Sequence, residues 1–444
     1  MGWLLERYKD VSCLKSTAVQ SKHRHSPIDG VTGERVSLSA VTCDIPPSLA
    51  WGHPVRRSYS QYLGDAKFSR AVYSTRAQNT PTVIFKIEPQ TSVKGLKLSI
   101  LDQSPISVGK TAYEAVRATL DLAEAADKWG YTRYWLAEHH SSDTLADASP
   151  EILLAAMSSR TKNIRIGSGG VMLSHYSPFK VAEVFRMLEA LAPGRVDMGL
   201  GRAPGSDQMA SYALQAGPNS FPIEKYPQQV YDLMRYLSET FPDDHPFSNL
   251  RAMPAAPSWA VPWLLSSSMG SVSIAAKLGL PLSFAHFIAQ DGGPEYVERY
   301  RDNFEPSEWF DKPRVNIGIS AMTADTAERA RDLGTCRHFM RLMRNKGQEM
   351  KGVPSVDEIK AMNFSGADED FIEQQRAKSV EGDPETVKAK IEGLAEQYET
   401  DDVIVLTITH DYAERQRSYQ LLAETFDLKG EGRVENAITK VEAE

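Results

Sequence analysis

The chain has 444 residues, 41% of them hydrophobic and 24% charged, which is typical of a globular protein with a large buried core. Its 58 acidic residues outnumber its 50 basic ones, and the resulting net charge of -8 argues against nucleic acid or an anionic membrane surface as a partner. No apolar stretch is long and uncharged enough to span a bilayer, and Cys13, Cys43 and Cys336 lie too far apart for a disulfide framework or a zinc site, so we expect a cytoplasmic protein.

Residues 1–94 differ from the rest of the chain, because they mix Lys, Arg, Ser and Pro without sustained periodicity. We interpret them as an N-terminal extension of low order. Two basic, serine-rich stretches, Arg56–Ser60 and Ser69–Arg76, are also typical of an organelle transit peptide, which would place the protein in mitochondria. Transit peptides are poor in acidic residues, however, and Glu6 and Asp10 are among those that interrupt this segment.

From residue 95 to residue 430, apolar strands alternate with amphipathic helices. The predicted strands cover residues 96–101, 131–138, 164–173, 195–200, 263–265, 282–285, 315–322 and 403–408. The predicted helices cover residues 112–129, 150–159, 178–191, 226–241, 271–278, 294–304, 325–342, a segment from 383 onward, and 411–426. No strand is followed by GxGxxG, so a doubly wound nucleotide-binding fold is disfavoured. Eight strand–helix units predict an α/β fold, the (β/α)8 TIM barrel.

Two long segments interrupt this alternation. Residues 201–227 form a polar stretch with few helix signals, as expected of a loop that builds a site. Residues 346–380, rich in Gly, Pro and charge, are predicted to be an insertion after the seventh strand and a candidate lid over the barrel mouth. Residues 431–444 form a C-terminal tail.

The first candidate site is Glu138-His139-His140, directly after the second strand. Barrel enzymes carry their reactive groups at the C-terminal ends of the strands, so we predict His139 and Glu138 as catalytic residues. Adjacent residues of an extended strand point to opposite faces, so the two imidazoles are unsuited to sharing a metal ion, and none is predicted. One His acting as an acid or base is the better interpretation. The alternative is that one His packs in the core and the other is solvated. His175 and His286 also follow strands but fit ordinary turns equally well.

The second candidate site is a serine-rich turn that leads from the fifth strand into a helix. Small residues there let backbone N–H groups approach an anion, and the helix dipole favours negative charge. Capping of the helix by one serine is the alternative. Arg202, at the end of the fourth strand, needs an anionic partner such as a phosphate, unless it pairs with Glu138 or Asp207. The binding residues predicted here are Arg202, Ser266, Ser267, Ser268, Met269, Gly270 and Ser271.

Together these segments resemble the luciferase-like monooxygenase superfamily, from about residue 95 to residue 428. The resemblance is carried by Leu136–His140, Gly194–Arg202, Ser266–Pro281, Gly382–Val387 and Arg417–Ala423. The chain departs from the family pattern in its N-terminal extension and in Ala203, where a glycine is usual.

The resemblance implies a barrel that uses reduced FMN, supplied by a separate reductase, and O2 to oxygenate a small organic substrate through a flavin hydroperoxide. By position, His139 matches the family's catalytic His, and Arg202 and Ser268–Ser271 match its flavin and phosphate contacts. Homodimers are common in the superfamily. The nearest alternative is a dehydrogenase that uses a deazaflavin coenzyme on the same barrel.

Two further alternatives come from other classes of protein. A non-catalytic flavin-binding protein is disfavoured because His139 and Glu138 are both present. A metal-dependent hydrolase barrel would need spaced ligands such as His-x-His on the first strand, and residues 96–103 contain no histidine.

Overall fold

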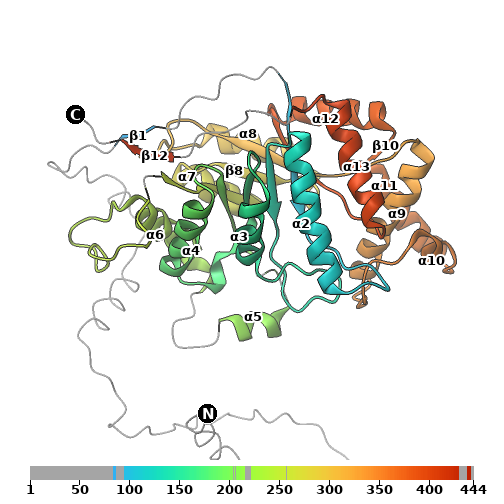
Figure 1. Cartoon of the computed structure of the whole chain (residues 1–444), viewed down its shortest axis with the longest axis horizontal. Helices are drawn as coiled ribbons and strands as arrows, with labels where there is room; N and C mark the ends of the chain where they lie inside the picture. Colours follow the sequence, from blue (N-terminus) through green and yellow to red (C-terminus); the bar gives the residue numbers. More distant parts are fainter. Residues whose placement is uncertain are drawn as a thin grey trace, which may run out of the picture. The chain divides into compact units, whose positions relative to one another are not determined.

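The computed structural model describes residues 84–86, 95–203, 205, 207–215, 222–256, 258–429 and 438–441, all within one compact unit (residues 67–444). In this part of the chain, eight parallel strands form a barrel that the pairings of β11 with β2 and of β8 with β9 close (Figure 1). The (β/α)8 TIM barrel is therefore confirmed. Its strands are β2 (Lys97–Asp102), β3 (Arg133–Leu136), β4 (Arg165–Met172), β5 (Val196–Gly201), β7 (Val261–Ser266), β8 (Leu282–Ala285), β9 (Val315–Thr323) and β11 (Asp402–Leu406).

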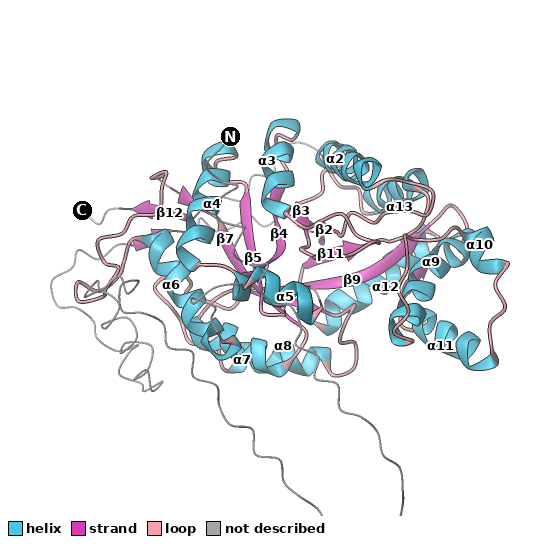
Figure 2. Cartoon of the chain, turned by 90° about the horizontal axis from the view of Figure 1, so that it is seen from below, coloured by secondary structure: helices cyan, strands magenta, loops and turns pink. Residues whose placement is uncertain are grey.

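Helices surround the barrel, as the view toward its C-terminal end shows (Figure 2). They are α2 (Ala112–Trp129), α3 (Pro150–Arg160), α4 (Pro178–Leu191), α6 (Tyr226–Ser238), α7 (Met269–Leu278), α8 (Gly293–Asp302), α12 (Pro384–Gln397) and α13 (Tyr412–Thr425). Local sequence sets their limits. In α2, Thr111 and Glu114 form a capping box, and Gly130 ends the helix at φ 89°, a left-handed conformation that glycine adopts without strain. None of the helices in the described part of the chain has the length and apolarity needed to cross a membrane.

Four charged side chains occupy the N-terminal half of the barrel interior: Arg133, Arg165, Asp197 and Asp402, here called the ion quartet. Asp197 Oδ2 accepts from Arg133 Nε at 3.1 Å, its Oδ1 accepts from Arg165 Nη2 at 2.7 Å, and Arg133 also pairs with Asp402. Burial by itself would raise the pKa of Asp197, but the two guanidiniums hold it below its ordinary value. Pairing makes this burial of charge tolerable. The interior below the mouth is thus filled by structural groups.

One excursion leaves the barrel between β9 and α12. It contains α9 (Ala327–Asn345), α10 (Val356–Lys360), α11 (Gly366–Ala377) and β10 (Val380–Gly382), and Figure 2 shows its helices to one side of the barrel. β10 extends the sheet by pairing with the last residues of β9. In a (β/α)8 barrel, the helix that connects two strands packs on both of them, and α12 does so for β9 and β11. We therefore assign α9, together with α10 and α11, to the excursion. The predicted insertion at residues 346–380 is the later part of it.

The sequence of residues 201–227 predicted a loop, but the described part of this segment is not all loop. It contains α5 (Gln208–Leu214) and a 3-10 turn at Ile223–Lys225. Asp207 caps α5, because its carboxylate accepts from the N–H of Ala210 at 2.7 Å. This one-residue signal was missed because the helix buries no apolar face that would reveal its periodicity.

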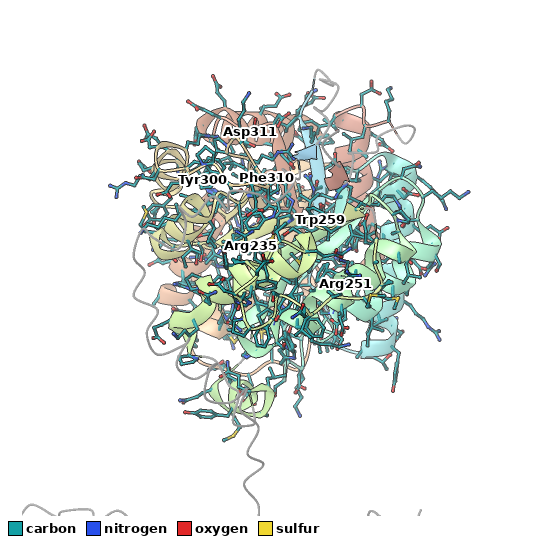
Figure 3. The ribbon with its side chains drawn as sticks, turned by 90° about the vertical axis from the view of Figure 1, so that its left-hand side faces the viewer. Arg235, Arg251, Trp259, Tyr300, Phe310 and Asp311 are labelled. Atoms are coloured by element: carbon teal, nitrogen blue, oxygen red, sulfur yellow. The ribbon has the colours of Figure 1, made fainter. Side chains whose placement is uncertain are left out.

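A three-stranded antiparallel sheet joins β1 (Ile84–Lys86), β12 (Ile438–Val441) and β6 (Ser258–Trp259). Apart from β1 and β12, the predicted extension (residues 1–94) and tail (residues 431–444) lie outside the described residues. Trp259 of β6 lies on the same side of the molecule as Arg235 of α6 (Figure 3). Arg235 is fixed there by Glu308, at 2.7 Å, and by the ring of Trp309, 5.4 Å from its guanidinium carbon.

Candidate functional site

Glu138 is enclosed at the C-terminal end of β3, with 1% of its surface exposed. Its Oε2 accepts from the N–H of Met172 at 2.9 Å, and its Oε1 accepts from the hydroxyl of Tyr176 at 2.6 Å and from Nε2 of His140 at 2.8 Å. These bonds tie the loop after β3 to the end of β4. The carboxylate therefore orients its neighbours, and His140 in particular.

His139 follows Glu138 in the loop after β3 and has a different partner. Its Nδ1 lies 3.0 Å from Oδ2 of Asp147, a fully buried carboxylate in the loop that follows. Burial raises the pKa of Asp147, and the hydrogen bond from His139 partly opposes that rise. When the carboxylate accepts this bond, Nδ1 carries the hydrogen, and in a neutral imidazole Nε2 is then the acceptor. Among the described residues, no hydrogen bond engages Nε2.

Asp147 was missed by the sequence analysis. It stands eight residues after His139 in an irregular loop, and no fixed spacing connects two such groups. The only signal was an acidic residue between a strand and the next helix, which is also typical of ordinary loops.

A second set of polar groups joins the loops after β3, β4 and β5. The rings of His140 and His175 are 6.2 Å apart in an edge-to-face arrangement, and Nε2 of Gln215 lies 3.1 Å from Nδ1 of His175. The N–H of His140 donates to the carbonyl of Gly205 at 3.1 Å. Gly205 has φ 61°, and a Cβ there would lie 2.7 Å from the carbonyl oxygen of Glu138, so only glycine fits. His175 is thus one contributor to a packed mouth, whereas His286 is held away by Tyr398 at 2.8 Å.

Arg202 and the start of α7 lie together at the ends of β5 and β7. A Cβ on Gly270 would come within 3.3 Å of Nη1 of Arg202, so the guanidinium lies against the first turn of α7. The side chain of the N-cap residue Ser268 makes no capping bond, and the first N–H groups of a helix have no acceptor within it. Ser266 is occupied differently, since its hydroxyl donates to the carbonyl of Ser268 at 2.9 Å.

Neither of the ion pairs considered for Arg202 forms. Glu138 is taken up by Met172, Tyr176 and His140, and within the described residues no hydrogen bond or ion pair engages the Arg202 guanidinium. A cation beside a helix N-terminus is an arrangement completed by an anion. The residues present therefore fit the phosphate of a flavin mononucleotide. Of the predicted set, Arg202, Ser268, Met269, Gly270 and Ser271 meet here.

The backbone of Val353, from the excursion, crosses the loops after β2 and β11. Its N–H donates to the carbonyl of Ile106 at 2.7 Å, and its carbonyl accepts from the N–H of Val108 at 2.9 Å. The same carbonyl lies 2.8 Å from Nδ1 of His410. The excursion is therefore fastened to one edge of the mouth, while its opening and closing as a lid stays a prediction.

A cavity of about 1060 Å³ opens at the opposite, N-terminal end of the barrel. Its lining includes Arg133 and Asp402 of the ion quartet, and Lys97, which pairs with Asp401 at 3.2 Å. These charges compensate one another, so we place the candidate site at the mouth. Across the described ranges, no group of three or more His, Cys, Asp or Glu side chains could hold a metal ion.

Comparison with known proteins gives a consistent result. Residues 96–400 match the family model described as luciferase-like monooxygenase. A Bacillus subtilis protein, YwcH, is 44% identical over 331 residues, covering 74% of this chain and 99% of YwcH. The N-acetyl-S-alkylcysteine monooxygenase of the same organism is 35% identical over 333 residues, covering 74% of this chain and 98% of that protein.

Solved structures agree on the fold. Apo-MsnO8 superimposes with a TM-score of 0.68 at 33% identity, covering 75% of this chain and 99% of MsnO8. At lower identity, and as evidence of fold alone, the neighbours include an FMN complex of the oxygenating constituent of 3,6-diketocamphane monooxygenase, at 18% identity and TM-score 0.57, covering 75% of this chain and 98% of that one. They also include an F420-dependent secondary alcohol dehydrogenase, at 14% identity and TM-score 0.53, covering 75% of this chain and 99% of that one.

Proposed function

This chain belongs to the luciferase-like monooxygenase family, and we propose that it is a flavin-dependent monooxygenase that uses reduced FMN and O2 to oxygenate a small organic substrate. The observation that supports FMN most directly is the uncompensated Arg202 guanidinium against the N-terminus of α7. When bound, reduced FMN supplies the electrons that activate O2. The protein would bind and orient the flavin, exclude water from the site and control the transfer of protons there.

The phosphate would be held by Arg202 and by the N–H groups of Met269, Gly270 and Ser271. Glycine at position 270 allows the guanidinium and the backbone to share one anion, because a larger residue would compete for the space. A phosphate at this position fixes one end of the cofactor on rigid elements, a strand end and a helix start.

His139 is the proposed acid–base residue. Asp147 holds its Nδ1–H at 3.0 Å, which presents Nε2 as a proton acceptor. Glu138 acts through others: it positions His140 and the end of β4. We therefore assign it a positioning role.

Besides the organic substrate, we propose two protein partners, a flavin reductase and a second copy of this chain. A separate flavin reductase would supply the reduced cofactor. A homodimer is also proposed, because Ile152 of α3 and Met187 and Leu191 of α4 expose 67%, 53% and 50% of their surfaces. The curated relative that acts on N-acetyl-S-alkylcysteine makes this class of thioether one to include in a substrate screen.

The test is rapid mixing of the full chain, loaded anaerobically with reduced FMN, against oxygenated buffer while the visible spectrum is recorded. The proposal expects the oxidised flavin spectrum to return more slowly than it does for free reduced FMN. If the protein binds the deazaflavin coenzyme and not FMN, it is a dehydrogenase of the same fold. If it binds FMN but leaves the reoxidation rate unchanged, it is a silent flavin-binding protein.

A further inference from the structure

Two arginines on α9 lie at a part of the barrel mouth that the proposed flavin site does not use. Nη1 of Arg341 donates to the carbonyl of Phe287, in the loop after β8, at 3.3 Å. One turn and one residue earlier, Cys336 Sγ lies 3.7 Å from the hydroxyl of Thr409, in the loop after β11. Helix α9 therefore bridges the loops on both sides of β9, and Arg337 lies on the helix between these two contacts in the sequence.

Phe287 places this contact at the rim of the barrel. A Cβ on Gly318 of β9 would lie 3.0 Å from the Phe287 ring, so this ring packs against the middle of β9. The Arg341 guanidinium rests on the backbone of the same residue. Arg337 and Arg341 are one helical turn apart, which puts their side chains on one face of α9.

Their charges are not compensated. Within the described part of the chain, no hydrogen bond or ion pair engages the Arg337 guanidinium. Burial, reinforced by the charge of Arg341, lowers the pKa of Arg337 to about 9. The carboxylate of Glu381 partly opposes this lowering of the Arg337 pKa, but it is bonded to Nε2 of His338 and to Arg376, the latter at 2.8 Å.

Two adjacent, partly desolvated guanidiniums without an anionic partner are unfavourable by themselves, and an anion between them removes the cost. We propose that Arg337 and Arg341 bind a carboxylate group of the organic substrate. A guanidinium matches a carboxylate with two parallel N–H bonds, and the negative Glu381 nearby disfavours a dianion such as a phosphate.

The position of the pair suits a substrate rather than the cofactor. In the closed order of the barrel, two strands separate β9 from β5, which carries Arg202 at its end, and two separate β9 from β3, which leads to His139. A substrate held by its carboxylate at β9 would extend across the mouth toward His139. This inference rests on the proposed function for its substrate, while the anion site itself can be tested without flavin.

The experiment uses the full chain and two matched probes, hexanoate and its neutral analogue hexanamide, at constant ionic strength. Binding is measured by isothermal titration calorimetry and by the shift in Tm, with and without oxidised FMN. We expect hexanoate to bind and hexanamide not to bind. Arg337→Gln and Arg341→Gln should each weaken hexanoate binding about tenfold, the loss expected for a charge-assisted contact. Arg337→Lys should recover part of it.

The matched control is Arg117→Gln, which removes the same charge from an exposed position of α2 and should leave hexanoate binding unchanged. FMN affinity should stay the same in all these variants. Equal hexanoate binding by wild type and Arg337→Gln would overturn the inference, as would equal binding of hexanamide. A loss of FMN affinity in Arg337→Gln with hexanoate unaffected would reassign the pair to the cofactor. If the wild type binds hexanoate but no FMN, the anion site stands and the proposed function fails.

Discussion

Replacing Arg202 with alanine should separate the affinity for FMN from the affinity for riboflavin, which lacks the phosphate. The guanidinium lies against the first turn of α7, close enough that a Cβ on Gly270 would be 3.3 Å from Nη1. No ion pair within the described residues holds it there, so its removal should leave the fold intact. The variant therefore tests the contact to the phosphate rather than a structural bond.

The size of the effect follows from the surroundings of Arg202. It is partly buried, and hydrogen bonds to a charged partner in such places contribute about 1.5–3 kcal/mol. A loss of about 2 kcal/mol corresponds to about 30-fold weaker binding. Gly270→Ala should produce a smaller loss, about threefold, because the guanidinium can move by a few tenths of an ångström to avoid the new methyl group.

The assay is fluorescence titration of each variant with FMN and with riboflavin, after thermal unfolding has shown that the variants are folded. The affinity for riboflavin should differ by no more than about twofold between wild type and Arg202→Ala, because riboflavin has no phosphate for Arg202 to contact. Equal losses for the two flavins would refute the phosphate assignment, and would mean that Arg202 contacts the ring or supports the loop.

Three other predictions follow from the same contacts. His139→Ala should keep FMN affinity but speed the return of the oxidised flavin spectrum about tenfold or more, and an unchanged rate in rapid mixing would contradict a proton-managing role. Glu138→Gln should lower the free energy of unfolding in urea by about 3 kcal/mol, because an amide donor would face one of the three donors around this side chain; a change below about 1 kcal/mol would show that the loop repacks. Burial raises the pKa of Asp232 in α6 from 3.8 to about 6, so the folded state favours the neutral acid, and its contribution to stability, full below pH 3.8, is lost as pH rises through 6. Asp232→Asn, which can keep the bond from Gln228, should therefore match wild type at pH 4 and be more stable by about 3 kcal/mol at pH 7, and an equal difference at both pH values would contradict this linkage.

The barrel could be predicted from sequence because each strand is a short apolar run with a polar end. The predicted strand at residues 315–322 corresponds to β9 (Val315–Thr323), and that at residues 195–200 to β5 (Val196–Gly201). The predicted strand at residues 131–138 is longer than β3 (Arg133–Leu136), because buried residues continue beyond the last ladder bond. Helices without a strong apolar face, such as α5, gave no such signal.

The candidate site was partly accessible from sequence. Position after a strand was enough to select His139 and Arg202, since the fold brings all strand ends to one place. Their partners depend on loop paths: Asp147 reaches His139 from an irregular segment, and Arg341 reaches the loop after β8 from the excursion. Residue spacing carries no information on such contacts. The structure alone shows that Glu138 is enclosed and bonded to the end of β4, whereas His139 is bonded to Asp147.

The ion quartet has a consequence for the electrostatics of the mouth above it. Two guanidiniums and two carboxylates sum to zero, so at the distance of the strand ends their fields largely cancel. The potential felt by any bound anion is then set by the charged groups nearer the rim, such as Arg202 and the carboxylate of Glu138. Neutralising one member, as in Asp402→Asn, would leave a positive charge below the mouth in a medium of low polarisability. Such a remote substitution would alter anion affinity at the rim without touching a single residue there.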